Sequence, residues 1–454
     1  VMLWGNYNGF PMHTTTILQG IRDIAGSDVK YLEGCSLTRN EVKKSLFNLL
    51  KSPDGRTGMK AQYWNNTNQE GKPVAEQYYT NPISLSNGGA TVFAPGVNLT
   101  DFSAKIQGEI TLEKDETIYF YATADDRMSV VVDGDTVVTS IRGGHSLKYK
   151  TASKLLKAKK KHTIIVDYVQ LDGMATLNFD IYRQFVPTDK EIMSYVADAS
   201  TVVFVGGISP KLEGEEMKVS EDGFKGGDRT KIELPQVQSE MLRKLHEAGK
   251  KVVFINCSGG AMALKTEEPY CDAILQGWYL GESGGQALAE VLYGKVNPSG
   301  KLPVTFYNST DELPDFLDYS MRNRTYRYFN GEPLYPFGYG LSYTSFTLSK
   351  PEYKDAFVDV SITNTGMMDG DEVVQVYIKR LADTEGPLKT LKGFKKVSLK
   401  AGETSLVSIP LRRDDFEVWD AATNTMRVLP GRYQVMVGTS SRDSDLHKFE
   451  VTIE

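Results

Sequence analysis

Residues 251–256 read Lys-Val-Val-Phe-Ile-Asn, and this short apolar run predicts a buried strand because Val, Phe and Ile favour extended backbone. A similar run, Val-Val-Phe-Val, occupies residues 202–205. Between the two, Pro235 begins a segment with apolar side chains at helical spacing, and Pro is common in the first turn of a helix. Those side chains belong to Val237, Met241, Leu242 and Leu245. Strand, helix and strand in this order predict a βαβ unit, which is typical of a parallel sheet.

The alternation of helix and strand extends to both sides of this unit. Further helices are expected over 14–25, 41–50, 191–197 and 284–293, and further strands over 29–32 and 273–278. These elements predict an α/β sandwich with a mostly parallel sheet, formed by residues 1–57 together with residues 186–346.

Two other regions of the chain have a β pattern. Within residues 58–185, apolar and polar side chains alternate, as in Thr117-Ile118-Tyr119-Phe120-Tyr121-Ala122, and turn residues separate the runs. This region therefore predicts a β-sandwich or a barrel inserted into the α/β domain. Residues 347–454 alternate in the same way and predict an immunoglobulin-like sandwich of about 100 residues. The expected fold class is multidomain, with α/β and all-β parts.

The composition limits the partners of the chain. Its 454 residues are 40% hydrophobic and 24% charged, with a formal net charge of −6, which is typical of a globular protein of several domains. The mild acidity argues against a nucleic-acid partner. No apolar run approaches the about 20 residues that a membrane span needs, so no membrane partner is expected. Cys35, Cys257 and Cys271 lack metal-ligand spacing and predict buried free thiols, and we expect neither a metal nor a cofactor.

A cluster of glutamates follows the strand expected at 202–205. The sequence there is Leu212-Glu213-Gly214-Glu215-Glu216-Met217, and Gly226-Gly227-Asp228-Arg229 comes shortly after it. Open α/β sheets place their ligand sites on loops that leave the carboxyl ends of strands. A carboxyl group on such a loop can donate a proton if burial or a neighbouring carboxylate raises its pKa. The alternative is a solvated acidic loop, and the residues alone leave both readings open.

Four stretches of the chain form recognisable motifs. They are Gly5-Asn6-Tyr7-Asn8-Gly9-Phe10-Pro11, the glutamate-rich loop ending in Asp228-Arg229 and Leu234-Pro235, Asn297-Pro298-Ser299-Gly300-Lys301-Leu302-Pro303, and Tyr326-Arg327-Tyr328-Phe329 followed by Pro333-Leu334-Tyr335-Pro336-Phe337-Gly338-Tyr339-Gly340-Leu341-Ser342-Tyr343. In sequence, order and spacing they resemble the C-terminal half of glycoside hydrolase family 3. The first motif and residues 212–217 resemble the β-xylosidase branch more than typical β-glucosidases.

The two β regions also resemble domains of the same enzymes. The sequence Tyr121-Ala122-Thr123-Ala124-Asp125-Asp126-Arg127 makes residues 58–185 similar to a PA14 domain. Residues 347–454 are similar to a fibronectin type III-like domain. The PA14 resemblance implies substrate-binding roles for Trp64, as a surface on which a sugar can stack, and for Asp126. The alternative for Trp64 is a place in the hydrophobic core.

Asp125 and Asp126 resemble an acidic pair that some PA14 domains use to bind calcium with sugar. Calcium takes about six to eight oxygen ligands, and two carboxylates fall well short of that number. The pair more often holds a turn, and no metal site is predicted.

The family resemblance implies a retaining exo-β-glycosidase that removes terminal xylose or glucose from plant-derived oligosaccharides. In such an enzyme an aspartate nucleophile and an acid/base glutamate lie only about 5–5.5 Å apart. Placed against the family pattern, Glu215 is the first candidate for the acid/base, Glu213 the second and Glu216 the third, with Glu216 otherwise a substrate-binding residue. Asp228-Arg229 is expected to form a structural ion pair or a loop anchor.

The nucleophile of this family lies on an N-terminal (β/α)8 barrel, and no eightfold strand–helix series occurs in this chain. The resemblance therefore implies that the chain supplies the acid/base, needs the barrel as a partner, and is inactive as a glycosidase alone. Residues 1–5 (Val-Met-Leu-Trp-Gly) lack a basic segment followed by an apolar one, so no signal peptide is expected in this chain. A periplasmic or secreted location is expected nonetheless.

The principal rival belongs to a different class of protein. In that alternative the chain is a non-catalytic carbohydrate-binding protein that acts through its PA14-like domain. Titration with xylose and xylo-oligosaccharides separates the two, especially with the Asp126→Ala variant. A third reading is a structural fragment whose α/β domain only supports a separate barrel.

Overall fold

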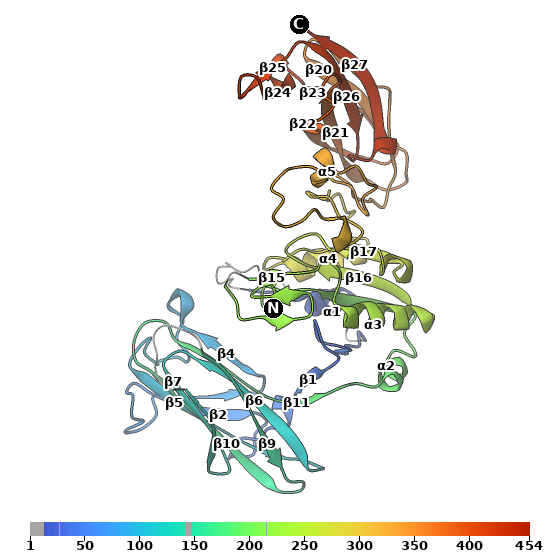
Figure 1. The fold of residues 1–454 in the computed structure, drawn as a ribbon. Helices are drawn as coiled ribbons and strands as arrows, with labels where there is room; N and C mark the ends of the chain where they lie inside the picture. Colours follow the sequence, from blue (N-terminus) through green and yellow to red (C-terminus); the bar gives the residue numbers. More distant parts are fainter. Residues whose placement is uncertain (1–12, 27, 141–147, 215) are drawn as a thin grey trace. The chain divides into compact units, whose positions relative to one another are not determined.

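The computed structural model describes residues 13–26, 28–140, 148–214 and 216–454 (Figure 1). The motif Gly5–Pro11 and the candidate acid Glu215 lie outside the described residues. The chain divides into two compact units. One combines the residues up to Tyr31 with Tyr195–Glu454, and the other consists of Leu32–Ser194. The protein is a multidomain molecule with an α/β part and all-β parts, rich in sheet and poor in helix.

The first unit contains a parallel sheet in the order β12–β16–β17. Its strands and helices are β12 (Thr201–Gly207), β16 (Lys251–Cys257), β17 (Ala273–Gln276), α1 (Ile17–Ala25), α3 (Gln236–Glu247) and α4 (Gly284–Leu292). The βαβ unit expected around residues 251–256 is present as β12, α3 and β16. In the described residues, no helix combines the length and apolar character needed to cross a lipid bilayer.

Helices lie on both faces of this sheet (Figure 1). One face presents Ile255 and Cys257, which pack against Ile17 and Ile21 of α1 and Leu288 of α4. Helix α3 contacts β12 and β16, and its buried residues follow the predicted apolar spacing. They are Val237, Gln238, Met241, Leu242 and Leu245. Strand β16 is buried along most of its length, which explains its continuous apolar run. The apolar residues of β12 are less buried, and Val205 is 36% exposed.

Short elements follow the strands. The segment after β12 forms a small antiparallel sheet, and the segment after α4 is mostly irregular. These elements are β13 (Ser220–Glu221), β14 (Phe224–Lys225), β15 (Asp228–Arg229), η3 (Glu268–Tyr270), η4 (Thr310–Glu312) and α5 (Thr325–Tyr328).

The C-terminal part of this unit is an antiparallel sandwich. One sheet has the order β18–β20–β19 with β23 on β20, the other has the order β22–β21–β26–β27, and β24 pairs with β25. The bounds are β18 (Phe346–Leu348), β19 (Glu352–Lys354), β20 (Phe357–Asn364), β21 (Gly370–Arg380), β22 (Thr390–Leu399), β23 (Thr404–Pro410), η5 (Arg413–Phe416), β24 (Glu417–Asp420), β25 (Thr425–Val428), β26 (Gly431–Gly438), η6 (Asp443–Asp445) and β27 (Leu446–Ile453). Alternate residues such as Val358, Val360 and Ile362 face a core shared by both sheets.

Two of the sequence motifs meet where the α/β part joins this sandwich. In the motif 297–303, Lys301 Nζ lies 2.6 Å from Glu372 Oε1 on β21, and the two side chains are only 14% and 9% exposed. Lys301 also donates to the carbonyl of Gly340 in the motif 333–343, at 3.0 Å. The amide of Gln375 donates to the carbonyl of Gly338, at 3.1 Å. These two motifs therefore hold the joint between the α/β part and the sandwich.

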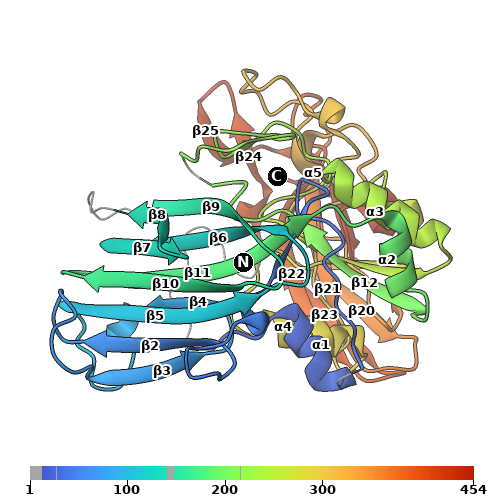
Figure 2. The ribbon, with the colours of Figure 1, turned by 90° about the horizontal axis from the view of Figure 1, so that it is seen from below.

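The second unit consists of two antiparallel sheets (Figure 2). One has the order β1–β11–β6–β9 with β4 on β11, and the other has the order β3–β2–β5–β10–β7–β8. The bounds are β1 (Val42–Ser45), η1 (Phe47–Leu49), β2 (Met59–Trp64), β3 (Ala75–Tyr79), β4 (Ile83–Ser86), η2 (Gly88–Ala90), β5 (Phe102–Thr111), β6 (Glu116–Ala124), β7 (Arg127–Val132), β8 (Asp135–Ser140), β9 (Lys148–Leu156), β10 (Lys161–Gln170), β11 (Thr176–Phe185) and α2 (Asp189–Tyr195). The buried side chains of both sheets form one core, as expected for a sandwich.

Two predicted elements of the N-terminal region are wrong. No strand forms over 29–32, and 41–50 is not a helix but contains β1 and η1. Strand β1 pairs with β11, with Val42 opposite Phe185, and Leu46, Phe47 and Leu50 enter the core of the second unit. The spacing of these apolar residues imitates a helix, but pairing with β11 determines their structure. Both elements therefore lie in the compact unit Leu32–Ser194. The domain boundary at 57/58 stays a prediction.

Candidate active site

The candidate site lies at the carboxyl end of the parallel sheet. Strand β12 ends at Gly207, and its backbone there is fixed by the side chain of Gln238 on α3. The Gly207 amide donates to Gln238 Oε1 at 2.7 Å, and Gln238 Nε2 donates to the Gly207 carbonyl at 2.7 Å. Since Gln238 is only 1% exposed, this pair of bonds is shielded from water. The backbone that precedes the glutamate-rich segment is thus held in place.

Residues that follow the three strands of the parallel sheet meet at Glu213. Glu213 follows β12, Gly259 follows β16, and Tyr279 follows β17. The Gly259 amide donates to Glu213 Oε1 at 3.0 Å, and the Tyr279 hydroxyl donates to the same oxygen at 2.5 Å. Burial, reinforced by the hydrogen bond to Glu213, raises the pKa of Tyr279 well above its usual value, so this hydroxyl stays protonated as a donor.

A polar network lies at the same end of β16 and β17. Asn256 Nδ2 donates to Gln276 Oε1 at 2.6 Å, and Gln276 Nε2 donates to Ser258 Oγ at 3.0 Å. Ser258 Oγ donates in turn to the Gly260 carbonyl at 2.7 Å. Asn256 and Ser258 are fully buried. These bonds hold the turn that carries the Gly259 amide to Glu213.

Arg229 holds the far end of the glutamate-rich loop. Its guanidinium donates to the carbonyls of Ala261 at 2.9 Å and Ile232 at 3.0 Å. Burial lowers the pKa of Arg229 below its usual value, while the charge of Glu213 acts in the opposite direction. These contacts support the sequence interpretation of Arg229 as a loop anchor.

The glutamates predicted as site residues are separated by the structure. Glu213 is half-buried in the contacts above, whereas Glu216 is exposed and has φ of +52°. Glu215 lies outside the described residues, so its role as the acid/base stays a prediction. The backbone after it is held where the Met217 amide donates to the Gly226 carbonyl at 3.1 Å.

The two remaining site predictions, Trp64 and Asp126, lie in the second unit. Trp64 is 7% exposed, and its indole N–H donates to the Gly71 carbonyl at 3.0 Å. Such burial leaves little ring surface for a sugar and favours the alternative of a core residue. The carboxylate of Asp126 accepts hydrogen bonds from the amides of Leu171 at 2.6 Å and Asp172 at 3.4 Å. The contacts of Asp126 are those of a residue that holds a turn. Its substrate role stays a prediction.

Tyr279 and Gly259 were not predicted from the sequence. The available signal was their position directly after the strands expected at 273–278 and 251–256, because parallel strands bring their carboxyl ends to one edge. Within the described part of the chain, no group of three or more His, Cys, Asp and Glu side chains is arranged to hold a metal ion.

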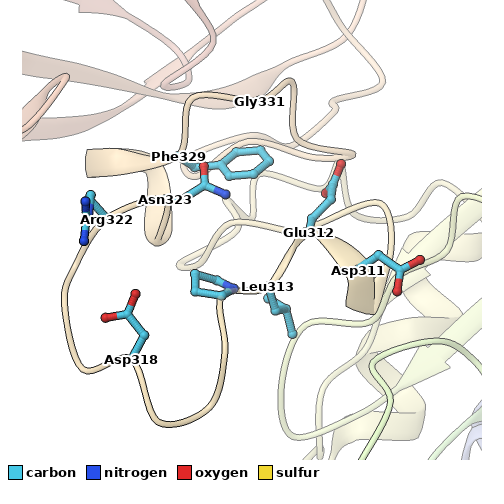
Figure 3. Close-up of a pocket in the computed structure, with 9 residues that line it drawn as sticks. Asp311, Glu312, Leu313, Asp318, Arg322, Asn323, Phe329 and Gly331 are labelled. Carbon is cyan, nitrogen blue, oxygen red and sulfur yellow. The ribbon is translucent and has the colours of Figure 1, made fainter.

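Two cavities lie in the region that joins α4 to the sandwich, away from Glu213. The first has a volume of about 420 Å³ and is shown in Figure 3, where Asp318 and Arg322 lie on one side and Asp311 and Glu312 on the other. It is lined by Asp311, Glu312, Leu313, Pro314, Asp318, Arg322, Asn323, Phe329 and Gly331. The second, of about 570 Å³, shares Phe329 and Gly331 and reaches Lys379 and Lys448 of the sandwich. Neither cavity is lined by Glu213.

Two regions of the chain match models of known protein families. Residues 1–343 match the model of the glycosyl hydrolase family 3 C-terminal domain, and residues 372–441 match a fibronectin type III-like domain.

The chain is also similar to individual proteins. It is 43% identical to a xylan 1,4-beta-xylosidase from Xylanibacter ruminicola, over 100% of this chain and 53% of that protein. A beta-xylosidase from Formosa agariphila is 35% identical over 58% of this chain and 37% of its own length. The crystal structure of a beta-glucosidase from Kluyveromyces marxianus matches 98% of this chain and 56% of that one, with a TM-score of 0.71 and 25% identity. The chain thus spans about half the length of the first of these relatives.

Proposed function

The chain belongs to glycosyl hydrolase family 3, and from this premise we propose that it is the C-terminal portion of a retaining exo-β-glycosidase. We propose β-xylosidase as its activity, with β-glucosidase as the closest alternative, acting on terminal sugars of plant-derived oligosaccharides. The observation that carries the proposal is the 43% identity to a xylan 1,4-beta-xylosidase over the whole of this chain.

The proposed acid/base is Glu215, on the loop that leaves the carboxyl end of the parallel sheet. It protonates the glycosidic oxygen in the first step and activates water in the second, as a retaining mechanism requires of one carboxyl group. The contacts of its neighbours support this assignment. Glu213 is tied to Gly259 and Tyr279 on one side, and Met217 is tied to Gly226 on the other. The described residues on either side of Glu215 are thus anchored, and proton transfer depends on the positioning of the acid.

The nucleophile is proposed to come from an N-terminal (β/α)8 barrel that partners this chain. Retention requires its carboxylate to lie about 5–5.5 Å from the acid/base. The chain alone is then expected to be inactive. The full-chain similarity to a relative of about twice its length supports this proposal.

The β-sandwich of Leu32–Ser194 is proposed to be a PA14-like domain, and the protein is proposed to act in the periplasm or outside the cell. A purely carbohydrate-binding function receives no support from the second unit. Trp64 is buried there, and Asp126 is engaged by backbone amides. Carbohydrate binding without catalysis therefore remains the weaker alternative.

The proposal is tested by producing the protein at the length of its relatives and assaying aryl β-xyloside, aryl β-glucoside and xylo-oligosaccharides. We expect release of single xylose units from one end, with the β anomer formed first in the NMR spectrum. Xylose binding by the 454-residue chain without hydrolysis by the longer protein would support the carbohydrate-binding alternative instead. Hydrolysis by the 454-residue chain alone would refute the need for a barrel.

A further inference from the structure

Tyr279 connects the last strand of the parallel sheet to the glutamate-rich loop. Its hydroxyl and the Gly259 amide both donate to Glu213 Oε1, at 2.5 and 3.0 Å. We propose that Tyr279 and Gly259 form a clamp on Glu213 that orients the acid-bearing loop, and that Tyr279 is a positioning residue for proton transfer. This inference rests on the proposed function, because the loop matters to catalysis only if it carries the acid.

The backbone before Tyr279 is held in an uncommon conformation. Trp278 has φ of +57°, in the left-handed region that a bulky residue rarely occupies. Its ring packs edge-to-face on Phe306, with centroids 6.2 Å apart. The preceding Gly277 amide is bonded to the Asn256 carbonyl at 2.8 Å. Strain of this kind persists where surrounding contacts enforce it and is common at functional sites. Here it directs the chain from β17 to a place where Tyr279 reaches Glu213.

The space around Glu213 also depends on the absence of a side chain at residue 259. A Cβ atom on Gly259 would lie 2.7 Å from Glu213 Oε1 and 2.9 Å from Cε2 of Tyr279. Both distances are too short, so any side chain there would displace the carboxylate or the ring. The next residue, Gly260, does not face this restriction, since its nearest neighbour would be Arg229 Nη1 at 3.5 Å. The clamp is therefore specific to residue 259.

The consequence for the loop follows from its length. Only Gly214 separates Glu213 from Glu215, so a change in the position of Glu213 is passed on over a single residue. A displacement of about 1 Å at a reacting group can lower a rate roughly a hundredfold. Loss of the clamp is expected to reduce proton transfer more than substrate binding.

Two pairs of variants test the clamp. Tyr279→Phe removes the hydroxyl, and Tyr335→Phe is its control, because Tyr335 also donates to a glutamate, Glu268, at 3.1 Å. Gly259→Ala adds the clashing methyl group, and Gly260→Ala is its control.

The first measurement uses the 454-residue chain and does not depend on activity. Hydrogen exchange of the amides of residues 208–219 is expected to accelerate roughly tenfold to a hundredfold in Tyr279→Phe and in Gly259→Ala, as for loss of a hydrogen bond to a charged group. Both controls should leave it unchanged. Unaltered exchange in both clamp variants overturns the proposal, whatever the enzyme assays show.

The second measurement uses the protein at the length of its relatives. With phenyl β-xyloside, a substrate with a poor leaving group, Tyr279→Phe is expected to lower kcat/KM about tenfold or more. With 2,4-dinitrophenyl β-xyloside the fall in kcat/KM should be small, because this leaving group needs no proton in the first step. Faster exchange combined with equal losses of kcat/KM on both substrates would overturn the positioning role. Absence of hydrolysis by the unaltered longer protein would count against the proposed function and leave the exchange result to decide the clamp.

Discussion

The ion pair between Lys301 and Glu372 allows the joint of the first unit to be tested quantitatively. The two charged atoms are 2.6 Å apart, and the side chains are 14% and 9% exposed. An exposed pair of this type contributes only about 0–1 kcal/mol, but removing one partner of a buried pair costs about 3–5 kcal/mol. Glu372→Ala is therefore expected to lower the free energy of unfolding by about 3 kcal/mol or more, because among the described residues the ammonium of Lys301 then keeps only the Gly340 carbonyl.

Urea unfolding of the chain measures this loss of stability, and hydrogen exchange monitored at the β21 amides measures it where the pair lies. The double variant Lys301→Met/Glu372→Leu is the control, since replacing both charges by apolar groups of similar size is expected to stay within about 1 kcal/mol of the parent. A loss below about 1 kcal/mol in Glu372→Ala would refute the reasoning. So would a double variant as unstable as the single one.

Three other changes have outcomes that follow from the contacts. Gly338→Ala should destabilise the chain by more than about 1 kcal/mol in urea unfolding, because φ is +77° and the new Cβ would lie 2.1 Å from Gln375 Oε1. Gly300→Ala is its control and should change stability by less than about 0.5 kcal/mol, because open space surrounds the new Cβ. Gln238→Ala should cost about 2 kcal/mol or more by the same method, because it leaves both backbone groups of Gly207 buried without their partners. Burial raises the pKa of Glu267, so its folded form holds a proton more tightly than the unfolded one, and this carboxyl loses stabilising effect as the pH rises from its ordinary pKa through the raised value. Glu267→Gln should consequently gain stability relative to the parent at pH 7 compared with pH 4, and an equal difference at both pH values would contradict this.

Much of the α/β fold could be predicted from local sequence. The apolar runs at 202–205 and 251–256 lie in β12 and β16, and the helical spacing after Pro235 lies in α3. Burial on both faces imposes the pattern of β16, so it can be recognised without knowledge of the partners, whereas the same pattern in β12 belongs to a strand that is only partly buried. The helix predicted over 41–50 was wrong because the apolar spacing of this segment fits both a helix and a core-facing strand with a short turn. Only the pairing of β1 with β11 decides between them.

The site was less accessible from the sequence. The most specific motifs, around Lys301 and Gly338, hold the joint to the sandwich and carry no acid or base of the candidate site. The glutamate-rich loop could be located because it follows a strand and is rich in carboxylates. Tyr279 and Gly259 could not be assigned to Glu213, because their meeting depends on how three parallel strands align at one edge. Such contacts between distant parts of the sequence have no local pattern.

The acid role of Glu215 is the central claim, and the leaving-group dependence of Glu215→Gln tests it most directly. In the protein at the length of its relatives, this variant is predicted to lose about a hundredfold or more of kcat/KM on phenyl β-xyloside, but less than about tenfold of kcat/KM on 2,4-dinitrophenyl β-xyloside, because kcat/KM reports the first step and this leaving group needs no proton. The Glu213→Gln variant, assayed beside it, should show the smaller loss on the phenyl substrate. A Glu215→Gln variant that hydrolyses phenyl β-xyloside at nearly the parent rate would contradict the assignment.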